Sequence, residues 1–343
     1  MGESMITWNL NMDFGNWQRR FLASCLLLIM TGCAAVPQSL ELSREPGNLP
    51  RRVMLDEVAF FPQVKYQCGP AALATVLSHR NVDVVPESLV EKVYIPERKG
   101  SLQIEMVATA RSYGKLTYPL ENQLKALLAE LAAGNPVLVF QNLSFSIWPQ
   151  WHYAVAVGYD LDNAELILRS GTYREYRLPL ATFERTWQRA GQWAYVVMPP
   201  GDIPVTATPK NYLLAAYDLE RAGFNQLALK SYRGAAKRWP ENSTALMALG
   251  NSEYSMGYMA QAQSVFTRVI QRHPEDGSAW NNLAYALAGG GCHQAAVSAV
   301  QCASQLAPTD DNIRQSLSEI SAMDNSRGAS CQVLSCPIEP TSQ

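Results

Sequence analysis

Cys68 occupies a position where a thiol is readily made reactive. It directly precedes a segment in which Pro70 suits the first turn of a helix and Leu73, Val76 and Leu77 follow at helical spacing. Cys68 is therefore expected at a helix N-terminus, where unpaired amide hydrogens and the helix dipole favour the thiolate and lower the thiol pKa. The alternative is a buried structural cysteine, which is the commoner state of an unpaired Cys.

His152 supplies the second group that thiol chemistry needs. It opens the β-branched, alternating segment 152–159, which predicts a strand, and the only other histidine before residue 200 is His79. A thiol at a helix start and an imidazole at a strand start, far apart in the sequence, are typical of enzymes in which the imidazole takes the thiol proton. A lone histidine is more often an ordinary core or surface residue, so this interpretation depends on Cys68.

The group that orients His152 is harder to find in the sequence. Asp160 lies eight residues along the same strand, roughly 26 Å away if the strand is straight. A turn over 161–164 and a returning strand over 165–169 bring Ser170 back beside the histidine. Ser170 is therefore the predicted partner, because its hydroxyl can fix the imidazole tautomer, although it cannot stabilise an imidazolium as a carboxylate would.

Attack on an amide also needs a donor for the developing oxyanion. Gln63, five residues before Cys68, is the first choice together with the Cys68 backbone N–H, and Gln67 is the second. Either glutamine can equally be a solvated loop residue. Trp148 and Trp151 flank the histidine, and we expect them to pack more than to bind.

The first 32 residues read as an export signal. Arg19 and Arg20 precede an uncharged run over 21–30, which is too short to span a bilayer but suits a signal core. The run ends in Met30-Thr31-Gly32-Cys33, which resembles a bacterial lipobox and predicts lipidation of Cys33; a plain cleaved signal peptide is the alternative. Ala34 after it resembles lipoproteins sorted to the outer membrane of a Gram-negative cell, facing the periplasm. Residues 33–52 have no apolar periodicity and predict a flexible tether between this membrane anchor and the first domain.

Composition predicts two folded domains beyond that anchor. The chain has 343 residues, a formal net charge of −2 and 48% hydrophobic residues, and nothing in this balance suggests a nucleic-acid partner. No motif implies a metal or an organic cofactor. Proline and glycine cluster over 199–209, so we divide the chain into a domain over 53–200, a linker over 201–208 and a second domain from 209. Within the first domain, helices are expected over 102–111, opened by Gly100-Ser101, and over 121–133, and a closing strand over 193–198.

The second domain carries a 34-residue period. Pro240, Pro274 and Pro308 recur at this spacing, and so do three glycines (Gly223, Gly257, Gly291) and three alanines (Ala228, Ala262, Ala296). The period is typical of tetratricopeptide repeats, so three helix pairs and a terminal helix over 312–323 are predicted within 209–325. The concave face of such an array commonly holds a protein partner; a purely structural spacer is the alternative.

Four cysteines, Cys292, Cys302, Cys331 and Cys336, lie in the last repeat and in the tail over 326–343. An oxidising periplasm makes them candidates for disulfides. Cys292 and Cys302 are roughly 15 Å apart if they share a helix, so they cannot pair with each other. If all four pair, the tail must fold back onto the third repeat, and the connectivity stays open. Metal binding with His293 is a competing interpretation without a CxxC spacing to support it.

The segments QCGPAALATVL, GNPVLV over 134–139 and HYAVAVGYD resemble bacterial papain-like cysteine peptidases related to those that cut double-glycine leaders from bacteriocin precursors. The resemblance covers about residues 53–200. It implies an α+β papain-like domain, ahead of the all-α repeat solenoid, with Cys68 as nucleophile, His152 as general base and acid, and Gln63 as oxyanion donor. Where that family carries Asp-Pro on the returning strand, this chain has Ser170-Gly171.

Together these features predict a lipid-anchored periplasmic cysteine peptidase that cleaves a peptide or protein, with a repeat domain that binds a protein. Two alternatives stay open. An acyltransferase or transglutaminase-like enzyme would use the same Cys68–His152 pair with another acceptor. An inactive outer-membrane scaffold is the other, because Ser170 stands where an acid is usual.

Overall fold

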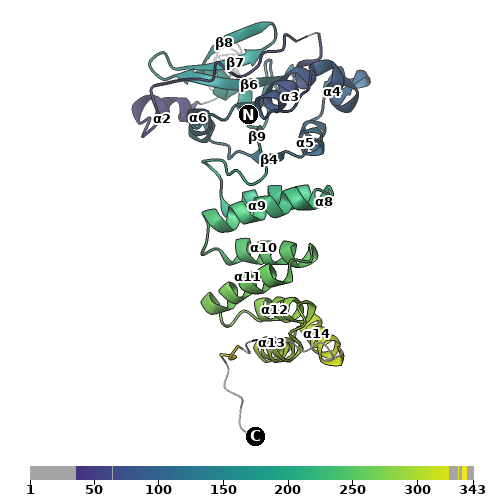
Figure 1. Cartoon of the computed structure of the whole chain (residues 1–343). Coiled ribbons are helices and arrows are strands. Elements are labelled where there is room, and N and C mark those ends of the chain that lie inside the picture. The colour runs from purple at the N-terminus through teal and green to yellow at the C-terminus, as the bar shows by residue number, and fades with distance from the viewer. Residues whose placement is uncertain (1–35, 64, 324–330, 332–333, 338–343) are drawn as a thin grey trace, which may run out of the picture.

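The computed structural model describes residues 36–63, 65–323, 331 and 334–337 (Figure 1). The predicted signal peptide over 1–32, the lipidation site Cys33 and most of the tail over 326–343 lie outside these residues. No helix among the described residues is both long enough and apolar enough to cross a membrane. The chain forms an α+β domain followed by a column of helix pairs, as the sequence predicts.

One antiparallel sheet organises the first domain. Its order is β4-β9-β5-β6-β7-β8, and β1 pairs with the far end of β6. Strand β6 is buried from Tyr153 onward, which explains its near-continuous apolar sequence. The strands are β1 (Arg52–Met54), β4 (Leu116–Pro119), β5 (Val137–Asn142), β6 (Trp151–Asp160), β7 (Glu165–Ser170), β8 (Tyr173–Pro179) and β9 (Ala194–Met198).

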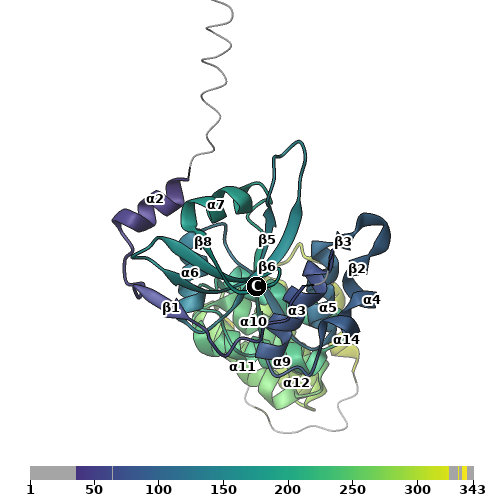
Figure 2. The ribbon, with the colours of Figure 1, turned by 90° about the horizontal axis from the view of Figure 1, so that it is seen from above.

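Helices cover this sheet from two sides: α3, α4 and α5 gather on one side in Figure 2, and α2 and α7 on the other. The helices are α2 (Pro37–Arg44), α3 (Cys68–His79), α4 (Pro86–Val93), α5 (Gln103–Ser112), α6 (Leu124–Ala132) and α7 (Leu180–Gln188). A small hairpin of β2 (Tyr94–Ile95) and β3 (Gly100–Ser101), joined by the 3₁₀ turn η1 (Pro96–Arg98), lies between α4 and α5. Gly100-Ser101 is therefore a strand and not the helix start that the sequence suggested.

The flexible tether predicted over 33–52 is wrong from residue 37 onward. Helix α2 packs against α6 and α7, and its Leu42 is buried in the core. The buried carboxylate of Glu184 accepts hydrogen bonds from the backbone N–H groups of Gln38 (3.1 Å) and Ser39 (2.7 Å). Such a charge-assisted cap fixes the helix N-terminus on the domain. The sequence does not predict this contact, because Glu184 is 145 residues from Ser39.

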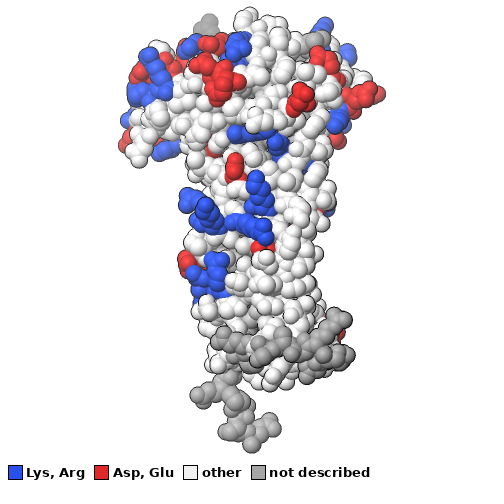
Figure 3. All heavy atoms as spheres, in the orientation of Figure 1, with Lys and Arg blue, Asp and Glu red and all other residues white. Residues whose placement is uncertain are grey.

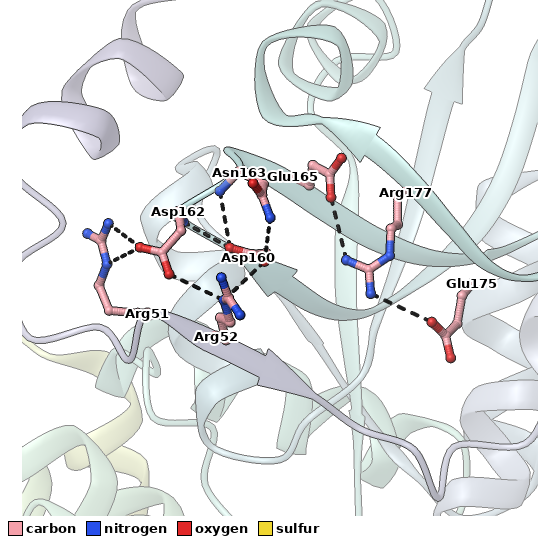
Figure 4. Close-up of polar contacts among 8 residues, drawn as sticks. All are labelled: Arg51, Arg52, Asp160, Asp162, Asn163, Glu165, Glu175 and Arg177. Atoms are coloured by element: carbon pink, nitrogen blue, oxygen red, sulfur yellow. Dashed lines mark hydrogen bonds and ion pairs between the residues drawn. The ribbon is translucent and has the colours of Figure 1, made fainter.

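The turn between β6 and β7 carries the acidic residues close to His152 in sequence (Figure 4). Asp160 accepts hydrogen bonds from the backbone N–H groups of Asp162 (2.9 Å) and Asn163 (3.1 Å). Its other oxygen lies 3.1 Å from the guanidinium of Arg52, which starts β1. These hydrogen bonds hold the pKa of Asp160 below its ordinary value. Asp160 therefore closes a turn and secures β1, well away from the imidazole.

The helix pairs of the second domain repeat one design. Thr208, Asn242, Asp276 and Asp310, each 34 residues after the last, cap a first helix with a side-chain oxygen. The glycine between the helices of each pair has a positive φ of 80–84°, and the recurring alanines are buried at the helix contacts. The helices are α8 (Pro209–Arg221), α9 (Asn225–Arg238), α10 (Ser243–Ser255), α11 (Met259–Arg272), α12 (Gly277–Gly289), α13 (His293–Leu306) and α14 (Asp311–Ala322).

Polar contacts link the first domain to α8 and to the linker before it. Arg111 of α5 pairs with Asp218 of α8, and the buried Glu130 accepts hydrogen bonds from the backbone N–H (2.8 Å) and hydroxyl (2.6 Å) of Thr206. On the face drawn in Figure 3, Lys and Arg side chains gather beside α9.

Two disulfides fasten the tail to the last repeat. Cys292 pairs with Cys331 and Cys302 pairs with Cys336, across sequence separations of 39 and 34. Cys292 and Cys302 do not bond to each other. The tail thus folds back onto the third repeat, the arrangement required if all four cysteines pair.

Candidate active site

Cys68 is the first residue of α3 and its thiol is free. Gln67 is the N-cap residue but makes no side-chain cap, so the first amide hydrogens of the helix remain near the sulfur. The half-buried thiol opens onto a cavity of about 930 Å³, which His152 and Gln63 also line. Three of the predicted site residues therefore share one cavity.

The β6–β7 hairpin brings Ser170 to His152. The imidazole Nε2 lies 2.8 Å from the Ser170 hydroxyl oxygen, a hydrogen bond that leaves Nδ1 as the remaining ring nitrogen. Beside it, the buried guanidinium of Arg169 donates to the backbone carbonyl oxygens of Val58 (3.1 Å) and Arg174 (2.5 Å). Arg169 holds neighbouring loops together, a role that its position in the sequence did not indicate.

The protonation states differ from the sequence expectation. Burial raises the pKa of the Cys68 thiol, although the backbone N–H groups of Tyr153, Gly69 and Cys68 act to lower it. Burial also lowers the pKa of His152 to about 4, and no carboxylate among the described residues offsets this effect. The prediction of a lowered thiol pKa was wrong, because desolvation outweighs the helix terminus. Both shifts favour the neutral forms, the thiol over the thiolate and the imidazole over the imidazolium.

Gln63 is fixed at the cavity by its backbone and its side chain. Its N–H donates to the Gly171 carbonyl oxygen (3.0 Å), and its side-chain Nε2 donates to the Tyr153 carbonyl oxygen (3.5 Å). The second hydrogen of this amide group is left for another acceptor. Gln67, the second choice, does not line the cavity.

Sequence reasoning missed the β2–β3 hairpin as a wall of the cavity. Ser101 packs so closely on Gly69 that a Cβ added there would lie 2.2 Å from the Ser101 hydroxyl oxygen. Tyr66 and Lys99, which also line the cavity, have left-handed backbones with φ of 67° and 50°. Such strained non-glycine residues cluster at functional sites, but φ cannot be seen in a sequence.

Aromatic rings form the opposite wall. Phe140 of β5 stacks on Trp151 with ring centroids 5.3 Å apart and meets Tyr153 at 4.4 Å. Trp151 packs on Phe140 as expected but stays 52% exposed, whereas Trp148 is 81% exposed, so the expectation of packing was wrong for Trp148. Apolar side chains left exposed beside a cavity are available to a ligand.

The array has its own smaller cavity of about 200 Å³, lined by Asn251, Tyr254, Phe266, Asn282 and Tyr285. Asn282 donates to the side-chain oxygen of Asn251 (2.8 Å), which links successive helix pairs. Within the described part of the chain, no cluster of three or more His, Cys, Asp or Glu side chains could hold a metal ion.

Comparison with known families agrees with this architecture. Residues 55–195 match the model of the Peptidase C39-like family, and residues 213–257 and 247–311 match a tetratricopeptide-repeat model. The first domain is therefore similar to C39-like peptidases, and the helix pairs after it are similar to tetratricopeptide repeats. No curated protein matches the chain.

Solved structures resemble its two parts at low identity. A C39-like peptidase from Bacillus anthracis is 17% identical over 43% of this chain and 98% of its own, with a TM-score of 0.37. The peptidase domain of Streptococcus ComA, a bifunctional ABC transporter, is 19% identical over 42% and 99%, with a TM-score of 0.34. The second tetratricopeptide domain of human RPAP3, solved with an HSP70 peptide, is 15% identical over 34% and 100%, with a TM-score of 0.31.

Proposed function

We propose that this protein is a cysteine peptidase that cleaves peptide bonds with Cys68 as nucleophile and His152 as general base and acid. The observation that carries the proposal is one cavity lined by a free thiol at a helix start and an imidazole whose Nε2 is bonded to Ser170. The C39-like match over residues 55–195 supports the same chemistry.

In this proposal the Cys68 thiol and the His152 imidazole are both neutral before the reaction, which determines the order of the proton transfers. With Nε2–H donating to Ser170, Nδ1 is free to take the Cys68 proton as the sulfur attacks the peptide carbonyl. The oxyanion then accepts hydrogen bonds from the Cys68 backbone N–H and the amide of Gln63. The imidazolium gives its proton to the leaving amine as the C–N bond breaks and leaves a thioester on Cys68. Water, activated by the imidazole, cleaves this thioester to a carboxylic acid and restores the thiol.

The experiment compares hydrolysis of a peptide library by the intact protein and by Cys68→Ala and His152→Ala, followed by mass spectrometry. We expect both variants to lose activity, His152→Ala by roughly 10²–10⁴-fold in kcat/KM. His273→Ala, in the repeat array, is the matched histidine control and should keep full activity. Hydrolysis that survives Cys68→Ala would reject the proposal. Added amine appearing in the products would assign acyl transfer instead.

We also propose that the protein is an outer-membrane lipoprotein anchored through Cys33 and facing the periplasm. The lipobox-like Met30-Thr31-Gly32-Cys33 and the two disulfides, which suit an oxidising compartment, support this location. Metabolic labelling with an alkyne fatty acid should mark the wild type and not Cys33→Ser. Equal labelling of both proteins would contradict the anchor.

The repeat domain binds a protein in this proposal. The polar and aromatic side chains of Asn251, Tyr254, Asn282 and Tyr285, which line its smaller cavity, support that cavity as the binding surface. Pull-down with Asn251→Ala/Asn282→Ala against the intact chain, with Arg314→Ala in α14 as control, tests this surface. Retention of every partner by the double variant would exclude it.

A further inference from the structure

The rim of the catalytic cavity carries an unbalanced positive charge. Among its described lining residues are Lys65, Arg98 and Lys99, and none is an Asp or a Glu. None of these three cations takes part in an ion pair with a described residue. Glu97, next to Arg98 in the chain, does not line the cavity. The cavity thus concentrates cations although the whole chain has a formal net charge of −2.

Tyr66 gathers two of these cations. The ammonium nitrogens of Lys65 and Lys99 lie 5.1 Å and 5.8 Å from the centroid of its ring. Cation–π contacts of this kind hold both nitrogens at the cavity mouth. Two like charges on one ring repel each other, and an anion placed between them would relieve that repulsion. Tyr66 and Lys99 both have left-handed backbones.

The opposite wall is apolar and extends beyond the cavity. Phe140 and Trp151 line it, and the loop that joins β5 to β6 between them also exposes Phe145 (76%), Ile147 (92%) and Trp148 (81%). A ligand that covers both the cavity and this loop must be longer than a small molecule. A cavity of about 930 Å³ with one cationic and one aromatic side therefore suits a polypeptide segment that presents both an acidic and an apolar side chain.

We propose that the cavity selects acidic peptide segments: a carboxylate side chain binds at Lys65, Arg98 and Lys99, and a neighbouring apolar or aromatic side chain packs on Phe140 and Trp151. This inference rests on the peptidase proposal, because the bound peptide would be the substrate. The test measures binding alone, so it does not require the protein to cleave the peptide.

The test measures binding of matched fluorescent peptides to full-length Cys68→Ala by anisotropy, one peptide with Asp and Phe and its counterpart with Lys in place of Asp. We expect about tenfold tighter binding of the acidic peptide at low ionic strength, falling towards equal affinity at high salt as the charges are screened. Lys65→Gln/Lys99→Asn should remove this preference; Asn tolerates the left-handed backbone at position 99. Trp151→Ala should weaken both peptides alike.

Lys92→Gln on α4 is the matched control, because Lys92 is exposed and does not line the cavity, and it should keep the preference. Equal binding of the two peptides, or a preference that survives the double lysine variant, would overturn the inference. If the acidic preference is found but the wild type cleaves no peptide, the peptidase proposal fails and the binding inference stands. If the wild type cleaves peptides but shows no preference for the acidic peptide, the binding inference fails and the peptidase proposal stands.

Discussion

The repeat array and the candidate active-site cavity depend on the sequence in opposite ways. In the array, caps, turn glycines and packing alanines recur at one spacing, and each helix pair contacts mainly its neighbours. The cavity draws Gln63 and Cys68, Ser101, and His152 from three separate segments that meet only when the sheet and the hairpin form. A local change should therefore stay local in the array, whereas a local change near the cavity should reach residues far along the chain.

The largest expected effect is a loss of stability in the repeat array that leaves the cavity around Cys68 unchanged. Cys302→Ala/Cys336→Ala removes one disulfide that closes a separation of 34 residues. The unfolded array then gains chain entropy, so its free energy of unfolding should fall by roughly 2–4 kcal/mol. Thermal unfolding followed by circular dichroism measures this loss. Cleavage of a short peptide by the folded variant should not change, because neither cysteine lines the catalytic cavity.

Reductant added to the unaltered protein is the control and should lower the stability of the array further, since both disulfides open. A parallel loss of short-peptide cleavage at a temperature where the array stays folded would break the comparison. It would mean that the array supports the cavity.

The second effect tests the long-range contact at the thiol. In Gly69→Ala the new Cβ would lie 2.2 Å from the Ser101 hydroxyl oxygen and 2.6 Å from its Cβ. The hairpin must move, so the free energy of unfolding should fall by roughly 1–3 kcal/mol, and cleavage should fall with it. Urea unfolding and kcat/KM measure the two losses.

Second substitutions at Ser101 sharpen this test. Ser101→Ala removes only the hydroxyl and should rescue Gly69→Ala in part, whereas Ser101→Gly removes both close atoms and should rescue it more fully. Gly100→Ala is the matched control, because the nearest atom to its Cβ is the Arg98 carbonyl oxygen at 3.8 Å. Equal losses in Gly69→Ala and Gly100→Ala would show that the Ser101 contact is unimportant.

The parts of the fold that the sequence predicts are those with a regular residue spacing. The 34-residue spacing fixes the helix pairs, since the same cap and the same glycine recur within a short stretch of chain. The strand pattern around His152 and the turn after Asp160 likewise predict the β6–β7 hairpin and bring Ser170 near the imidazole. These are short-range signals.

The rest depends on contacts between distant residues. Glu184 caps α2 from far along the chain, so a segment without apolar periodicity is ordered and not a tether. Desolvation of Cys68 and His152 depends on what surrounds them in the fold, so the direction of the thiol pKa could not be read from the helix start alone. At the cationic rim, Lys65 and Lys99 both lie over the ring of Tyr66. Lys99 is far from Tyr66 in the sequence, so no sequence spacing predicts this contact.

The smallest expected effect concerns Ser170, which stands where the peptidase family that this domain resembles carries a carboxylate. Ser170→Ala removes the 2.8 Å hydrogen bond to Nε2, which should lower kcat/KM about tenfold, the equivalent of one lost hydrogen bond. His152 acts as a base only when neutral, so kcat/KM of the wild type should fall as the pH drops through a pKa of about 4. A carboxylate favours the imidazolium, so Ser170→Asp should raise that pKa and move the acid limb to higher pH. An unchanged rate in Ser170→Ala, together with an unmoved acid limb in Ser170→Asp, would mean that the imidazole is positioned by its burial alone.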